Sequence, residues 1–87
     1  MKLKNALDYI QKRFTYHKTC RDFDERNARA YRNLCNHQAS VLATNNAKEH
    51  QACMYEITTI LAYITDETWQ NTYEELDKGE ENDNNSI

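Results

Sequence analysis

The most distinctive chemistry in this sequence lies in the segment from Arg13 to Thr19, which reads RFTYHKT. It combines two aromatic rings, an imidazole, two hydroxyls and two cations. The ring of Tyr16 can stack on a nucleotide base, and Lys or Arg can form charge-assisted hydrogen bonds to phosphate. The segment therefore contains the side chains that a nucleotide ligand needs. The alternative is structural: Phe14 packs in the core, Tyr16 fills a gap and the cations face solvent.

Hydrophobic periodicity predicts the elements that would position this segment. A short amphipathic helix is expected over residues 2–13, followed by an irregular connector over residues 14–21. Asp22 and Glu25 have the spacing of a capping box, in which two side chains accept from each other's backbone N–H groups. This spacing predicts a second helix over residues 23–43.

A third helix is expected over residues 47–76, because Asn46 and Glu49 form another capping box ahead of a strong apolar stripe. Residues 77–87 have high charge and few apolar side chains, which is typical of a disordered acidic tail. No segment has the alternation of a strand. The sequence thus predicts one all-α domain over residues 1–76, with a short N-terminal helix and a hairpin of two long antiparallel helices.

The composition of the 87 residues excludes several classes of protein. The single glycine, Gly79, rules out a glycine-rich phosphate loop or dinucleotide fingerprint. No apolar run is long enough for a membrane span, and we expect neither a signal peptide nor a disulfide framework. Leu, Ile, Val and Phe make up only about 16% of the chain, which is low for a packed domain. We therefore expect a cytosolic protein that gains burial by forming a homo-oligomer.

The charge is divided between the two ends of the chain. Residues 1–32 carry nine Lys or Arg against four Asp or Glu, whereas residues 66–87 carry eight acidic residues and one lysine. Such asymmetry indicates an anionic partner for the basic third, although a solvated helix face has the same composition.

The other candidate chemistry is weak. Histidine and cysteine lie near one another three times, in the pairs His17–Cys20, Cys35–His37 and His50–Cys53. Zinc favours such ligands, but there is no CxxC pair and the three pairs would have to converge from separate elements. No nucleophile has a base and an orienting group beside it. We expect no metal, no cofactor and no enzymatic activity.

A resemblance adds to this interpretation. The segment RFTYH at residues 13–17, the Arg-rich helix after it and NNAKEHQACMYEITTILAYIT at residues 45–65 resemble the hairpin domain of phage anti-CBASS proteins. The similarity covers residues 10–65, and FTYH is its most specific part. Members of this family are small all-helical proteins.

The resemblance implies that the protein sequesters a ligand. Family members bind the cyclic oligonucleotides that bacterial immune cyclases make, such as cyclic GMP-AMP and related cyclic di- and trinucleotides, and do not cleave them. Two protomers contribute the same residues to each dinucleotide, and dimers assemble into a hexamer with separate trinucleotide pockets. The resemblance thus implies an immune-evasion protein in the cytoplasm of the infected bacterial host.

The resemblance also implies which residues bind the ligand. Tyr16 matches the tyrosine that stacks on a base. Arg32 matches the cation that pairs with phosphate if the turn after His17 holds one extra residue, and Arg29 is the alternative. Thr65 matches a polar residue that lines the site. The remaining expected ligand contacts are Thr15, His17 and Lys18, of which Lys18 stands where relatives usually have proline.

A second class of function stays open from sequence. A host-takeover protein could bind a bacterial protein or nucleic acid through its charged surfaces, although neither DNA nor a membrane is the expected partner. The two classes differ in one observation. Ligand sequestration predicts cyclic dinucleotide binding that Tyr16→Ala abolishes and Arg32→Ala weakens, whereas host takeover predicts a stable macromolecular complex that Tyr16→Ala leaves unchanged.

Overall fold

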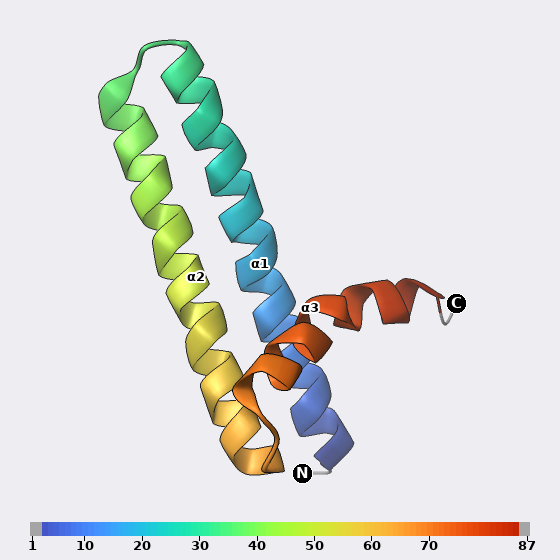
Figure 1. Ribbon diagram of the computed structural model, residues 1–87. Coiled ribbons are helices and arrows are strands. Elements are labelled where there is room, and N and C mark those ends of the chain that lie inside the picture. Colours follow the sequence, from blue (N-terminus) through green and yellow to red (C-terminus); the bar gives the residue numbers. More distant parts are fainter. Residues whose placement is uncertain (1–2, 86–87) are drawn as a thin grey trace.

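The computed structural model describes residues 3–85, with side chains described through Gly79, and these residues form three α-helices (Figure 1). Helix α1 spans Leu3–Asn33, α2 spans His37–Thr65 and α3 spans Trp69–Asn85. Helices α1 and α2 lie side by side and antiparallel, and α3 crosses them near the end of the hairpin far from its turn. No strand occurs among residues 3–85, so the prediction of an all-α fold is confirmed.

Helix α1 is continuous where we expected a helix, a connector and the beginning of a second helix. Its buried residues, Phe14, His17 and Ala28, are spaced so that they fall on one side of a continuous helix. Nothing interrupts this pattern, because α1 contains neither proline nor glycine. The predicted connector over residues 14–21 is therefore wrong.

The hairpin turn lies at residues 34–36, which is earlier than the expected break near Asn46. Cys35 adopts a left-handed conformation with φ of 59°. The Asn36 side chain then accepts a hydrogen bond from the Ala39 N–H at 3.2 Å and caps α2. Asn46 lies inside α2, just as Asp22 lies inside α1, so neither predicted capping box begins a helix. Such a motif caps a helix only where the chain before it has left helical geometry.

The predicted helix over residues 47–76 is divided into two. Asp66, with φ of 55°, ends α2, and the Thr68 hydroxyl accepts from the Asn71 N–H at 3.2 Å at the beginning of α3. The backbone of residues 77–85, where we expected a disordered tail, continues α3. The last two residues of that expected tail, 86 and 87, lie outside the described part of the chain.

The core has two parts of different character. Where α3 covers the hairpin, Phe14, Met54 and Leu76 form a buried cluster, and the edge of Tyr73 meets the Phe14 ring with centroids 5.5 Å apart. Nearer the turn, the buried residues between α1 and α2 are small. They are Ala28, Ser40, Ala43 and Ala47. Large apolar side chains are therefore buried mainly at the end that α3 covers.

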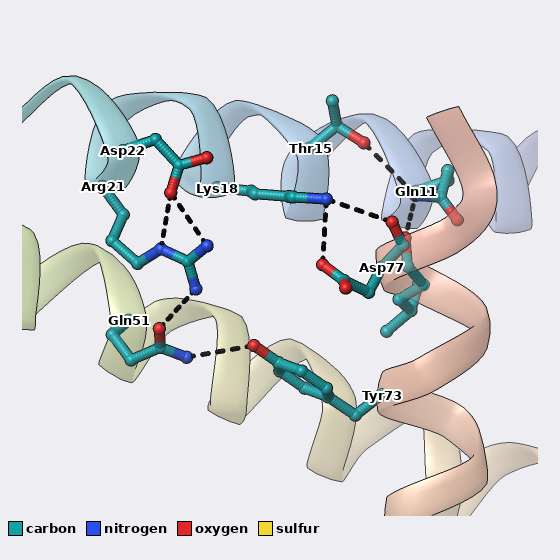
Figure 2. Close-up of polar contacts among 9 residues, drawn as sticks. Gln11, Thr15, Lys18, Arg21, Asp22, Gln51, Tyr73 and Asp77 are labelled. Atoms are coloured by element: carbon teal, nitrogen blue, oxygen red, sulfur yellow. Dashed lines mark hydrogen bonds and ion pairs between the residues drawn. The ribbon is translucent and has the colours of Figure 1, made fainter. Parts of the chain in front are cut away.

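Polar contacts fix α3 against the hairpin (Figure 2). The Lys18 Nζ lies 2.9 Å from a carboxylate oxygen of Asp77 and donates to the Asp77 carbonyl at 3.1 Å. The Gln51 amide donates to the Tyr73 hydroxyl at 3.4 Å, and the Gln11 amide donates to an α3 carbonyl at 2.8 Å. These contacts hold α3 on one face of the hairpin and leave the opposite face uncovered.

Candidate functional site

The Tyr16 ring lies on the uncovered side of α1 and is 53% exposed. The Arg13 guanidinium carbon lies 5.4 Å from the centroid of this ring, which is a cation–π distance. The rings of His17 and His50 meet Tyr16 edge-on, with centroids at 5.2 and 6.3 Å. Tyr16 is therefore an open aromatic surface whose orientation is fixed by three neighbours from two helices.

The two histidines next to Tyr16 are hydrogen-bonded to each other, and His17 is also hydrogen-bonded to Arg13. Arg13 Nη2 lies 3.3 Å from His17 Nε2, His17 Nδ1 lies 2.9 Å from His50 Nδ1, and His50 Nε2 lies 3.9 Å from an Asp24 oxygen. A guanidinium can only donate, so His17 Nε2 must accept. His17 therefore carries its proton on Nδ1 and donates it to His50, which leaves the proton of neutral His50 on Nε2, facing Asp24.

His17 is only 9% exposed. Burial lowers its pKa below the usual value, and the nearby positive charge of Arg13 lowers it further. The hydrogen bond from Arg13 also favours neutral His17, because a protonated imidazole has no nitrogen free to accept it. His17 is thus held in its neutral form in the folded protein.

We predict that the fold loses stability as the pH falls below about 6.5, the ordinary pKa of histidine. Below pH 6.5 the unfolded chain takes up a proton on His17, whereas the folded chain does so only at lower pH. The free energy of unfolding therefore keeps its full value above about pH 6.5 and decreases as the pH falls below it. Thermal melts between pH 7.5 and 5.5 should show this decrease. His17→Gln should flatten the profile, and His37→Gln, at an exposed position, should not. Identical profiles for both variants and the parent would contradict the assignment.

A hollow of about 460 Å³ lies between α1 and α2, and His50, whose ring meets Tyr16, forms part of its lining. Phe23, 56% exposed, and Arg26 border it from α1, and His50 borders it from α2. Phe23 follows Tyr16 by two helical turns, about 10 Å along the same side of α1. We call the surface formed by Arg13, Tyr16, Phe23 and His50 the Tyr16 face. Arg26 borders the hollow but not this face, because it lies 13 residues from Arg13, about 20 Å along α1 and roughly 140° around it.

The Tyr16 face also has acidic neighbours. Asp24 and Glu49 border the hollow, and Asp24 lies beside His50. Its chemistry is therefore two aromatic rings and one arginine, with an imidazole and carboxylates at one edge.

Thr15 and Lys18, two of the expected ligand contacts, lie on the side of α1 that α3 covers. Lys18 is paired with Asp77, and the Thr15 hydroxyl accepts from Gln11 at 3.2 Å (Figure 2). Both residues help to position α3 and do not join the Tyr16 face.

Arg29 and Arg32, the candidate phosphate cations, border a separate hollow of about 270 Å³. Because α1 is continuous, Arg32 lies about 24 Å along the helix from Tyr16, and its direction from the axis differs by roughly 160°. Arg29 is turned away from Tyr16 by a similar angle. Within one chain, neither arginine shares a surface with Tyr16.

Thr65 is also distant from Tyr16. It lies at the end of α2, about 22 Å along that helix from His50, and its hydroxyl donates to the Leu61 carbonyl at 2.8 Å. Of the expected site residues, the structure thus brings only Tyr16 and His17 together.

The sequence did not single out Arg13 or His50 as partners of Tyr16. Arg13 precedes Tyr16 by three residues, and residues with this spacing lie on the same side of a helix. The pairing was therefore hidden because we expected this segment to be irregular. His50 has no local signal, because its position depends on the pairing of α2 with α1.

Two of the three His–Cys pairs do approach each other, through the contact between His17 and His50. Among the side chains that the structure describes, however, no three His, Cys, Asp or Glu residues form a group able to hold a metal ion. Within the same residues, no helix is both long and apolar enough to cross a membrane.

The fold and the site define a small all-α protein with an aromatic and cationic face left open by its third helix. Comparisons of the chain with protein-family models, curated proteins and solved structures find no match.

Proposed function

We propose that this chain binds cyclic oligonucleotide second messengers, such as cyclic GMP-AMP and related cyclic di- and trinucleotides, and sequesters them without cleavage. In the cytoplasm of an infected bacterium, this would keep the messengers from the immune effectors of the host. The observation that carries the proposal is the half-exposed Tyr16 ring, with Arg13 over it and with His50, which also lines a hollow between α1 and α2, at its edge.

Each part of the Tyr16 face has a role in this proposal. A base stacks on the Tyr16 ring, and such stacking is worth roughly 1–3 kcal/mol for each base. Arg13, beside Tyr16, provides planar donors for phosphate oxygens, and the guanidinium geometry suits two parallel hydrogen bonds. Phe23 offers a second ring about 10 Å away for an extended ligand.

The chemistry of the histidines supports binding in preference to cleavage. Both ring nitrogens of His17 are engaged, by Arg13 and by His50, so His17 has no free nitrogen to accept a proton from an attacking group. The Nδ1 of His50 is occupied by the same contact. These histidines support the orientation of Tyr16.

We further propose that the ligand lies between two copies of the chain. Arg29 and Arg32 are too far from Tyr16 to reach the same small ligand within one chain, but a second copy related by a twofold axis can bring its own arginines to it. Unburied apolar surface supports self-association. Among the described residues, five leucine and isoleucine side chains are more than half exposed: Leu3, Leu34, Leu42, Ile60 and Ile64.

Light scattering should therefore give a solution mass that is a multiple of 10.3 kDa, either a dimer or a dimer-built hexamer. A monomer at every protein concentration tested would contradict the two-copy site.

Sequestration can be tested by retention. Pure protein is mixed with a panel of cyclic di- and trinucleotides, passed over a membrane that retains protein, and then denatured to release the bound ligand. We expect the cyclic ligand to be retained and recovered intact. Free passage of every ligand would contradict binding, and recovery of linear products would contradict sequestration without cleavage.

A further inference from the structure

A larger hollow, of about 930 Å³, lies where the beginning of α1, the end of α2 and α3 meet. Three leucines, Leu7, Leu61 and Leu76, supply its apolar lining. Leu76 is buried in the core, whereas Leu7 is 38% exposed, so part of this apolar lining is open to solvent. We call this hollow the α3 groove.

The polar lining of the α3 groove is acidic. Four carboxylates border it, from Asp8, Glu67, Glu74 and Glu75, and Lys12 is the only cation among the described side chains that line it. None of the four takes part in an ion pair among the described side chains. This separates the α3 groove from the arginine-bearing Tyr16 face, and it disfavours an anionic ligand.

Two features keep this end of the molecule negative. Glu67 accepts from the Thr68 N–H at 3.0 Å and from the Asn71 amide at 3.2 Å, and both contacts lower its pKa. The last turn of α2, which reaches the groove at Thr65, contains no basic residue to balance the partial negative charge of its carbonyl groups. Both features favour a cationic occupant.

We propose that the α3 groove binds a basic amphipathic segment of a partner protein. Apolar side chains of such a segment would cover Leu7 and Leu61, and its Lys or Arg side chains would meet Glu74 and Glu75. A small inorganic cation would leave the leucines exposed, and a nucleotide would be repelled by the carboxylates. A peptide with both apolar and basic side chains matches both parts of the lining.

The probe is a fluorescent synthetic peptide of about 14 residues, four helical turns, with leucines on one side and lysines on the other. A matched peptide with glutamate in place of lysine is the negative control. Anisotropy is measured at about 150 mM salt, where distant surface charges are screened. We expect saturable binding of the basic peptide only.

Charge-matched variants locate the binding. Glu74→Gln with Glu75→Gln removes two carboxylates from the groove, and Glu49→Gln with Glu56→Gln removes two exposed carboxylates of α2 outside it. The first pair should weaken peptide binding about ten-fold, and the second should change it less than about two-fold. Leu7→Ser should also weaken binding, because the apolar contact is lost. Circular dichroism checks that each variant is folded.

Three results would overturn the proposal. The first is that the basic peptide does not bind the parent protein. The second is that both double variants lose the same peptide affinity. The third is that the double variant at Glu74 and Glu75 changes the solution mass of the protein but not its peptide affinity. The second result indicates general electrostatic attraction, and the third indicates a second copy of the chain in the groove. None depends on cyclic nucleotide binding, so this proposal and the proposed function can fail separately.

Discussion

Phe14→Ala is expected to lower the free energy of unfolding by about 3–5 kcal/mol, the usual effect of removing a buried phenylalanine ring. Phe14 is 0% exposed, shares its cluster with Met54 and Leu76, and contacts the edge of Tyr73. These contacts join all three helices. Since small domains have only about 5–15 kcal/mol of stability in total, this variant should melt at a much lower temperature or be unfolded.

Phe23→Ala is the matched control, because it makes the same chemical change in the same helix at a side chain that is 56% exposed. It should cost less than about 1 kcal/mol. Phe14→Leu, which keeps most of the apolar volume, should fall between the two. Urea unfolding followed by circular dichroism measures all three, and equal losses for Phe14→Ala and Phe23→Ala would contradict the core described here.

Tyr16→Ala is expected to remove most of the affinity for cyclic dinucleotides. Loss of one stacked ring costs roughly 1–3 kcal/mol, and a twofold site loses two rings, so affinity should fall by at least about 30-fold. The fold should be retained, because Tyr16 is half exposed and outside the core. Circular dichroism can confirm this before the affinity is measured.

Two variants test whether the stacking surface of Tyr16 causes that loss. Tyr16→Phe keeps the ring and should retain most of the affinity. Tyr63→Ala removes another tyrosine, 89% exposed on α2, and should have no effect. If Tyr63→Ala weakened binding as much as Tyr16→Ala, the ligand would not be recognised at the Tyr16 face.

The all-α class could be predicted from sequence, because the apolar spacing fits helices and no segment alternates like a strand. The positions of the breaks could not. The capping boxes at Asp22 and Asn46 have the right spacing but lie within helices. The true turn depends on Cys35, a residue with no strong preference for the left-handed conformation, followed by the Asn36 cap.

The candidate site was only partly predictable for the same reason. The side chains of Arg13 and Tyr16 are visible in sequence, but their shared side depends on helical geometry through a segment we expected to be irregular. Treating residues 14–21 as a connector also grouped Lys18 with Tyr16, whereas a helix turns Lys18 toward Asp77. His50 enters the site only through the packing of α2 against α1.

Binding of cyclic oligonucleotides is tested by a calorimetric titration of the pure protein with cyclic GMP-AMP and a panel of related cyclic di- and trinucleotides. We expect saturable binding of at least one of these ligands, at nanomolar affinity if the protein is to compete with an effector, which corresponds to about −12 kcal/mol. This binding should be lost in Tyr16→Ala and kept in Tyr63→Ala. No heat with any member of the panel, for folded protein, would contradict it.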